Sequence, residues 1–122
     1  MQYLGFVWIG LFVEDLEASV AFYRDILSLR VLGKGDDWAH FDAGGGALFE
    51  LFSGGKAAAQ PKTTAQQPLV VGLRVKDFDV AMVELQAKGI RFTETGEFEN
   101  TRWAHFSDPE GNQLEIKIVP ET

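Results

Sequence analysis

The sequence predicts an α+β fold built from two tandem βαβββ modules that form a curved mixed sheet around a central cavity. A fifteen-residue segment occurs twice, at 37–51 and 102–116, and each copy contains Trp-Ala-His-Phe. The copies agree at six positions, where ordinary composition gives about one. A helix-like pattern precedes each copy. Because each repeat alone buries little surface, we expect the two to share one fold and to enclose a space between them.

The domain prediction follows from the positions of the repeats. The upstream match of 11–23 with 73–85, on Leu, Val and Asp, extends each repeat to a whole module. We therefore expect a single domain over 1–122, with modules 1–53 and 69–120 joined by linker 54–68. The linker region has no apolar period, and its length makes it a candidate mobile lid.

The elements of the first module are predicted from hydrophobic spacing. Residues 4–13 are apolar, aromatic and β-branched, which is typical of a buried strand. Asp15 is placed to cap a helix in which apolar residues recur at helical spacing. The positions that form this apolar stripe are Leu16, Val20, Tyr23 and Leu27. Three short strands and one glycine-rich turn should follow, at 30–34, 38–41, 47–52 and 42–46.

The second module should repeat this order. A strand is expected at 69–75, and a helix should begin after Asp77 and end at Gly89. The remaining strands and the tight turn before the last one are predicted at 90–94, 102–106, 113–119 and 108–112.

Composition limits the partners. The formal net charge of −7 argues against nucleic acid, because phosphate binding needs a basic face. No apolar run is long enough to span a membrane, and the amino-terminal residues do not resemble a signal peptide. The absence of cysteine excludes disulfides and thiolate metal sites. We expect a cytoplasmic protein whose partner is a small molecule.

Strand alternation predicts which side chains face the cavity. Ile9, Leu11 and Val13 should lie under the helix, which leaves Trp8, Gly10 and Phe12 on the opposite face. Pairing of the hairpin strands places His40 across from Glu50, and His105 across from Glu115, on that same face. The other side chains predicted there are Phe52, Arg74, Trp38, Trp103 and Lys117.

At these residues the chain resembles the vicinal oxygen chelate superfamily, which includes glyoxalase I, extradiol dioxygenases, and fosfomycin- and bleomycin-resistance proteins. The matching motifs are VEDLEASVAFYRDIL, VKDFDVAMVELQAKGI and FSDPEGNQLEI. The resemblance covers nearly the whole chain, and the Asp-Pro-Glu-Gly-Asn turn with its following glutamate is the most specific part. It implies the glyoxalase fold, and a homodimer, since family members commonly dimerise.

The resemblance also implies positions for metal ligands. Metal-binding members take their ligands from the first and last strands of each module, which correspond here to Trp8, Glu50, Val70 and Glu115. Only the two glutamates carry a donor atom for a metal. We therefore expect either no cofactor or a weakly bound divalent metal at Glu50 and Glu115.

The roles of the acidic and histidine side chains stay open. Glu50 and Glu115 are predicted catalytic residues, as residual metal ligands or as a general acid and base, unless neighbouring histidines, Arg74 or Lys117 neutralise them. His40 and His105 are possible additional metal ligands. The alternative is that each histidine is hydrogen-bonded to its neighbouring glutamate.

The aromatic side chains carry the functional hypothesis. They should bind a small aromatic or polar compound together with His40, His105, Arg74 and Lys117. They could instead fill the core or a dimer interface. The first hypothesis predicts a bleomycin-resistance-like binding protein with a degenerate metal site. The alternatives are a metal-dependent lyase, isomerase or dioxygenase of the same superfamily, and a structural or sensing dimer with a filled cavity.

Overall fold

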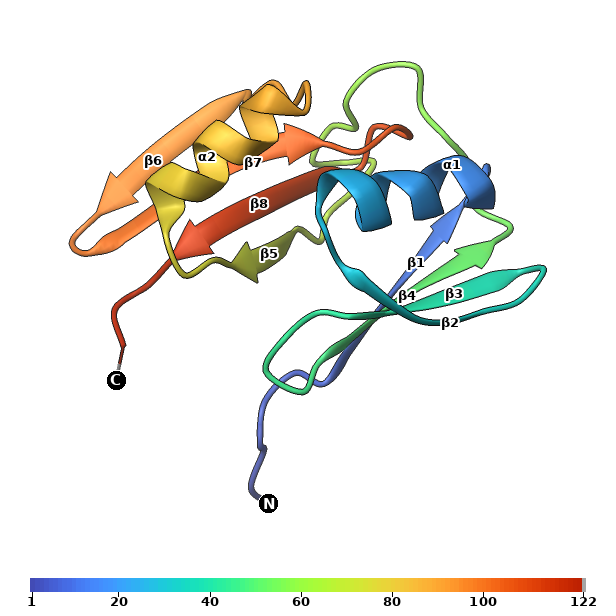
Figure 1. Cartoon of the computed structure of the whole chain (residues 1–122), viewed down its shortest axis with the longest axis horizontal. Coiled ribbons are helices and arrows are strands. Elements are labelled where there is room, and N and C mark those ends of the chain that lie inside the picture. The colour runs from blue at the N-terminus through green and yellow to red at the C-terminus, as the bar shows by residue number, and fades with distance from the viewer. Residues whose placement is uncertain (122) are drawn as a thin grey trace. The chain divides into compact units, whose positions relative to one another are not determined.

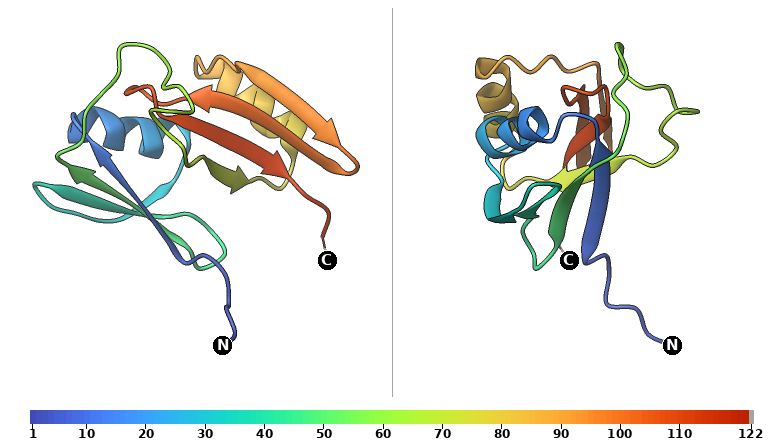
Figure 2. Two further views of the ribbon diagram at one scale, coloured as in Figure 1. Left: turned by 180° about the vertical axis from the view of Figure 1, so that it is seen from behind. Right: turned by 90° about the vertical axis from the view of Figure 1, so that its right-hand side faces the viewer.

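The structure is a computed structural model that describes residues 1–121, and it confirms the α+β architecture with two tandem modules (Figure 1). The chain divides into two compact units, Met1–Ala57 and Ala58–Thr122, and each contains one module. Each module is a four-stranded mixed sheet with helical structure on one face, as the side view in Figure 2 shows. None of the helices within residues 1–121 is long and apolar enough to cross a membrane.

The first module has its strands in the order β1-β4-β3-β2, with β1 parallel to β4 and the other pairs antiparallel. Its elements are β1 (Trp8–Val13), α1 (Leu16–Ala21), the π-helical turn η1 (Phe22–Ile26), β2 (Arg30–Lys34), β3 (Trp38–Asp42) and β4 (Leu48–Ser53).

The predicted helix is present, and its cap is confirmed. The Asp15 carboxylate accepts a hydrogen bond from the Ala18 N–H at 3.0 Å. The helix then widens by one turn, because the Leu27 N–H donates to the Phe22 carbonyl, five residues back, at 3.1 Å. Its buried face carries Tyr23, whose ring centroid lies 4.7 Å from that of Phe49. The helix thus covers the apolar face of the sheet.

The second module repeats the plan, with strand order β5-β8-β7-β6 and β5 parallel to β8. Its elements are β5 (Val71–Arg74), α2 (Phe78–Ala87), β6 (Glu94–Phe98), β7 (Thr101–Ser107) and β8 (Gln113–Ile118). Asp77 caps α2 by accepting from the Val80 N–H at 3.0 Å, and Gly89 follows the helix with φ of +94°. The core beneath α2 is formed by Phe78, Leu85, Ala104, Phe106, Leu114 and Ile116.

The predicted strand at 90–94 is wrong, because β6 begins only at Glu94. The Phe92 ring packs edge-on against Phe106, with centroids 5.9 Å apart, so its apolar character reflects core packing. The ladder with β7 is positioned by the tight turn near Glu99, whose φ is +54°. The apolar residues of 90–94 therefore indicated the segment before β6, and they did not indicate the strand itself.

The predicted first strand of each module is too long. Residues 4–7 lie outside β1, and their side chains are exposed in the first unit, Leu4 and Phe6 almost completely. The β4 strand pairs only from Leu48, opposite Trp8, so the ladder has no partner strand further upstream. In the second module, residues 69 and 70 likewise precede β5. Apolar composition alone did not reveal where the partner strand begins.

Several residues of the linker 54–68 form hydrogen bonds with one unit or the other. The Gly55 N–H donates to the Val13 carbonyl at 3.0 Å in the first unit. In the second unit, the Lys62 N–H donates to the Gly111 carbonyl at 2.8 Å, and the Lys62 Nζ donates to Asn112 Oδ1 at 2.6 Å. A polar sequence without periodicity carries no sign of these partners.

Candidate ligand-binding faces

The face of each sheet that is turned away from its helix carries the side chains singled out from the sequence. In β4, Phe49 and Leu51 are buried beneath the helix, whereas Glu50 between them lies on the opposite face. Trp8 and Phe12 in β1 are 49% and 60% exposed. The predicted division of the strands into two faces is therefore confirmed. We call the helix-free surfaces the open face of the first and of the second module.

A glutamate and a histidine lie side by side at the centre of each open face. His40 and Glu50 are cross-strand partners in the first module, and His105 and Glu115 are partners in the second. On the neighbouring parallel strand, the partner of Glu50 is Gly10 and the partner of Glu115 is Gly72. The predicted register is confirmed, and the repeated Trp-Ala-His-Phe segment occupies equivalent strands.

Both carboxylate oxygens of Glu50 are engaged by side chains of its own module. The Trp8 Nε1–H donates to Glu50 Oε1 at 2.9 Å. The His40 Nε2 is hydrogen-bonded to Glu50 Oε2. The carboxylate side chain is only 14% exposed, so these two partners replace most of the water that it would otherwise bind.

Glu115 is held in a corresponding way with one different partner. The His105 Nε2 lies 2.8 Å from Glu115 Oε1, and the Lys117 Nζ lies 3.2 Å from Glu115 Oε2. A second carboxylate approaches the other side of the imidazole, because Glu94 Oε2 lies 3.8 Å from His105 Nδ1. Sequence reasoning missed Glu94, since the strand that carries it was predicted to end there.

These donor sets do not fit a resident metal ion. The indole of Trp8 can only donate, and it donates to the carboxylate that a metal would need. Val70 has no donor atom. Within residues 1–121, no group of three or more His, Cys, Asp or Glu side chains is arranged to hold a metal ion. Two carboxylates already satisfied by N–H groups are a weak substitute for the three or four ligands of a usual site.

An aromatic row flanks the Glu50–His40 pair on the first open face. The Phe12 and Phe52 rings are stacked with centroids 5.1 Å apart, and Trp8 lies 6.3 Å from Phe52. Trp38 is the cross-strand partner of Phe52, and its ring lies 4.8 Å from the imidazole of His40. Four of the predicted ligand-binding aromatic residues thus belong to one continuous surface of the first module.

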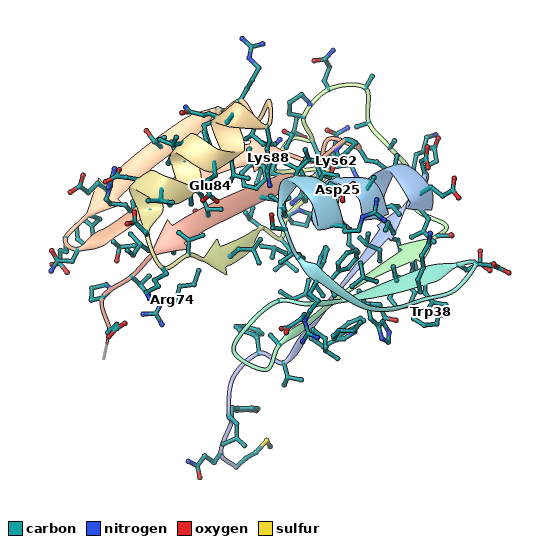
Figure 3. The ribbon with its side chains drawn as sticks, in the orientation of Figure 1. Asp25, Trp38, Lys62, Arg74, Glu84 and Lys88 are labelled. Atoms are coloured by element: carbon teal, nitrogen blue, oxygen red, sulfur yellow. The ribbon has the colours of Figure 1, made fainter. Side chains whose placement is uncertain are left out.

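The corresponding row of the second module carries two cations. Lys117 is the cross-strand partner of both Trp103 and Arg74. Its Nζ lies 5.6 Å from the centroid of the Trp103 ring. An Arg74 guanidinium N–H donates to the Val119 carbonyl at 3.4 Å. Figure 3 labels Arg74 beside β5, and Trp38 on the first module. Within residues 1–121, the ion pair of Glu115 with these cations is the one to Lys117.

Each tryptophan ring lies against a glycine. The sequence analysis did not recognise this pairing of glycines with tryptophans. A Cβ added to Gly10 would meet the Trp8 ring at 2.3 Å, and one added to Gly96 would meet Trp103 at 2.2 Å. Gly35 has the same relation to Trp38, at 2.3 Å. The indoles therefore lie flat against the sheet, where only glycine leaves room for them. A glycine opposite or two residues from a tryptophan in a strand is the signal that could have indicated this arrangement.

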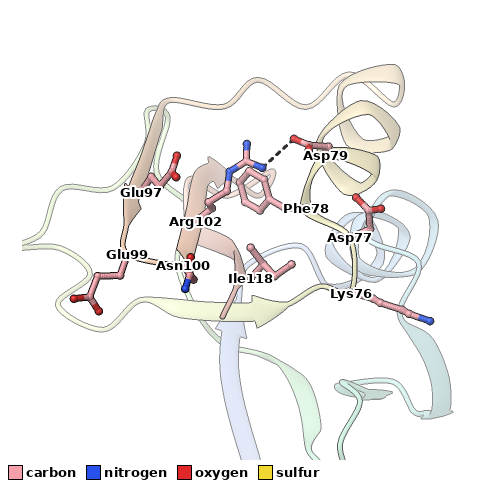
Figure 4. A pocket seen from close by; sticks show the side chains of 9 residues that line it. All are labelled: Lys76, Asp77, Phe78, Asp79, Glu97, Glu99, Asn100, Arg102 and Ile118. Atoms are coloured by element: carbon pink, nitrogen blue, oxygen red, sulfur yellow. Dashed lines mark hydrogen bonds and ion pairs between the residues drawn. The ribbon is translucent and has the colours of Figure 1, made fainter. Parts of the chain in front are cut away.

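A hollow of about 420 Å³ lies elsewhere in the second module, at the start of α2 (Figure 4). Arg102 crosses it, donates to Asp79 Oδ1 at 3.1 Å and covers the Phe78 ring at 4.4 Å. The rest of its wall is lined by Lys76, Asp77, Glu97, Glu99, Asn100 and Ile118.

Comparison with known proteins agrees with this architecture. Residues 5–116 match the family model described as the Glyoxalase/Bleomycin resistance protein/Dioxygenase superfamily. The uncharacterized protein YraH of Bacillus subtilis (strain 168) is 31% identical over 121 residues, which covers 88% of this chain and 93% of that protein.

Solved structures share the fold at lower identity. A glyoxalase/dioxygenase from Nostoc punctiforme has a TM-score of 0.80 and 24% identity, covering 97% of this chain and 92% of that one. Lactoylglutathione lyase from Agrobacterium tumefaciens has a TM-score of 0.76 and 20% identity, with coverage of 96% and 95%. On the family match, the YraH relative and the two-module fold, the chain belongs to the glyoxalase/bleomycin resistance protein/dioxygenase superfamily.

Proposed function

We propose that this protein binds a planar aromatic compound on the open face of its first module, without a metal. The main observation behind this proposal is the exposed aromatic row beside Glu50, whose carboxylate already has hydrogen-bond partners in the protein. The proposal makes Trp8, Phe12, Trp38 and Phe52 the ligand-binding residues. In this arrangement each Glu50 oxygen already has a protein partner, Trp8 Nε1 on one side and His40 Nε2 on the other.

The aromatic row supports binding through the surface that it exposes. Trp8, Phe12 and Trp38 are 49%, 60% and 37% exposed, and each has neighbouring rings within the same sheet face. Covering apolar surface stabilises a complex by about 25 cal/mol per Å², and an offset aromatic pair adds about 0.5–1.5 kcal/mol. A flat ligand that covers several of these rings therefore gains more than a compact aliphatic one.

Glu50 acts in this proposal as a positioning residue. Its two oxygens hold the Trp8 indole on one side and the His40 imidazole on the other. Trp38 in turn lies against His40. The carboxylate thus fixes the rings that border the binding surface, which lowers the entropy lost when a ligand orders them.

The test is a titration of metal-stripped protein with 2-naphthamide, a neutral planar probe, followed by the three tryptophan indole N–H signals in NMR spectra. Each signal is assigned with a Trp→Phe variant. We expect the Trp8 and Trp38 signals to shift in the presence of EDTA. Phe12→Ala should weaken binding several-fold. Phe98→Ala is the matched control, since Phe98 is similarly exposed, at 68%, but lies in the second module.

Two results would contradict the proposal. One is the absence of any shift at Trp8 and Trp38 with this probe and with a panel of larger planar compounds. The other is binding that appears only after a divalent metal is added and disappears in Glu50→Gln, which would favour the metal-dependent enzyme.

A further inference from the structure

We propose that the open face of the second module is a separate binding site for aromatic anions, formed by Trp103, Lys117 and Arg74. The aromatic ring of the ligand would lie against Trp103, and its carboxylate or other acidic group would be held by the two cations. This goes beyond the proposed function in both place and chemistry, because it assigns a second site and a charged class of ligand.

The three side chains form one row across neighbouring strands. Trp103 in β7 is the partner of Lys117 in β8, and Lys117 is the partner of Arg74 in β5. Partners on one sheet face have Cβ atoms about 5 Å apart, so the three groups are within reach of one small ligand. No movement of either module is required to bring them together.

Comparison of the two modules shows that these cations are specific to the second one. The equivalent row of the first module is Phe12, Phe52 and Trp38, with the tryptophan conserved in both repeats. The two phenylalanines correspond to Arg74 and Lys117, whereas the glutamate and histidine of the next row are the same in both modules. The duplicated surfaces therefore share their central row and differ in the groups that would touch a ligand.

The adjacent cations have a physical cost that an anion would relieve. Like charges on directly neighbouring strand positions destabilise a sheet. Glu115 compensates Lys117, at 3.2 Å, but it also contacts His105, and the hydrogen bond that Arg74 makes within residues 1–121 is to the Val119 carbonyl. Arg74 has five guanidinium N–H groups and Lys117 has three ammonium N–H groups, so both keep donors for a ligand. The acidic groups near the row are Glu115 and Glu94 on the His105 side, and Glu121, which lines a hollow together with Arg74.

Trp103 is held in an orientation that suits stacking. Its indole lies flat over Gly96, where an added Cβ would come within 2.2 Å of the ring. One side of the ring is thus against the sheet, and the Lys117 Nζ lies over the ring, 5.6 Å from its centroid. A planar anion placed there would combine stacking with charge-assisted hydrogen bonds, which are about twice as strong as neutral ones.

The test compares 2-naphthoate with 2-naphthamide, which has nearly the same shape and no charge, in NMR titrations of the full-length protein. We expect 2-naphthoate to shift the Trp103 indole signal and to bind there at least about tenfold more tightly than the amide. The Arg74→Gln/Lys117→Gln double variant should remove this preference. The matched control is Arg91→Gln/Lys34→Gln, which removes the same charge at exposed positions outside the row.

The outcomes separate this inference from the proposed function. A Trp103 shift by naphthoate that persists in the double variant, or equal affinities for acid and amide at Trp103, would overturn the anion site. If naphthoate leaves Trp103 unaffected while the amide shifts Trp8 and Trp38, the anion site is wrong and the proposed function stands. If only Trp103 responds, only to naphthoate, and the panel of larger planar compounds leaves Trp8 and Trp38 unshifted, the anion site stands and the proposed function of the first module is wrong.

Discussion

At the scale of single residues, Trp8 is where the first module departs from the metal-ligand set that the resemblance implies. Trp8 occupies the first-strand position from which the resemblance implies a metal ligand, and its indole N–H instead donates to Glu50. An N–H donor and a metal ion compete for the same carboxylate lone pair. We therefore expect the side chain at position 8 to influence whether Glu50 has a protein donor or a cation as its partner.

Replacing this donor should create a metal site. In Trp8→His, the new imidazole, His40 and Glu50 would supply three ligands on one sheet face, which is the usual number in an open zinc site. We expect Zn²⁺ or Ni²⁺ to raise the melting temperature of this variant. Metal at ten times its Kd adds about 1.4 kcal/mol to the free energy of unfolding.

The controls for this variant are Trp8→Phe, which loses the donor without gaining a ligand, and Trp8→His/Glu50→Gln. Both should melt at the same temperature with and without metal. A metal-dependent shift of equal size in Trp8→Phe would show that position 8 does not control the site.

At the scale of elements, the β3–β4 hairpin depends on the turn that begins at Asp42. The Asp42 carboxylate accepts from the Gly44 N–H at 2.8 Å and from an Arg30 guanidinium N–H at 3.0 Å. These hydrogen bonds, the one from Gly44 first, hold the pKa of Asp42 below its ordinary value. The same hairpin sets His40 opposite Glu50, so the turn contributes to the register of the site.

The lowered pKa predicts acid sensitivity. A group whose pKa is lower in the folded than in the unfolded protein stabilises the fold above the unfolded pKa, about 3.9, and this contribution is lost as pH falls through the folded pKa. Asp42→Asn should therefore be less stable than the parent near pH 7, with the difference shrinking below about pH 4. Urea unfolding across this range measures it.

The comparison variant is Asp36→Asn, which removes the same charge at an exposed position in the preceding loop. A stability difference for Asp42→Asn that stays constant from pH 7 to pH 3 would contradict the role given to the ionised carboxylate.

At the scale of the whole molecule, the linker is shared between the two units. The Ala57 N–H donates to Glu14 Oε1 at 3.1 Å, whereas the Ala58 N–H donates to the Glu110 carbonyl at 3.0 Å. Beyond this point the chain is attached to the second module, where Gln67 forms the last anchor before β5. Its Oε1 accepts from the Gln113 N–H at 2.6 Å, and its Nε2 donates to the Gln113 carbonyl at 2.9 Å.

Loss of this anchor should destabilise the second module. Gln67→Ala leaves the backbone N–H and C=O of the part-buried Gln113 without their side-chain partner, which costs about 1–3 kcal/mol. We expect this loss in the free energy of unfolding measured with urea. Gln66→Ala is the matched control, because Gln66 is exposed and accepts only from the nearby Thr63 N–H. Equal losses in both variants would show that the Gln67 contacts are not an anchor.

The amino-acid sequence by itself determined the duplication, the two capped helices, the face on which each strand residue lies and the pairing of each histidine with its glutamate. These features follow from local periodicity and from a repeat that shows the same pattern twice. It also indicated that Trp8 and Val70 cannot be metal ligands, since that depends only on side-chain chemistry.

Only the tertiary structure decided which partners satisfy the two carboxylates, where β1 and β6 begin, and how the linker is attached. The Trp8–Glu50 hydrogen bond joins residues 42 positions apart, and Glu94 lies near His105 because the two are partners in the β6–β7 ladder. Such contacts depend on the ladder register and on side-chain direction across strands, and hydrophobic spacing along one strand contains neither.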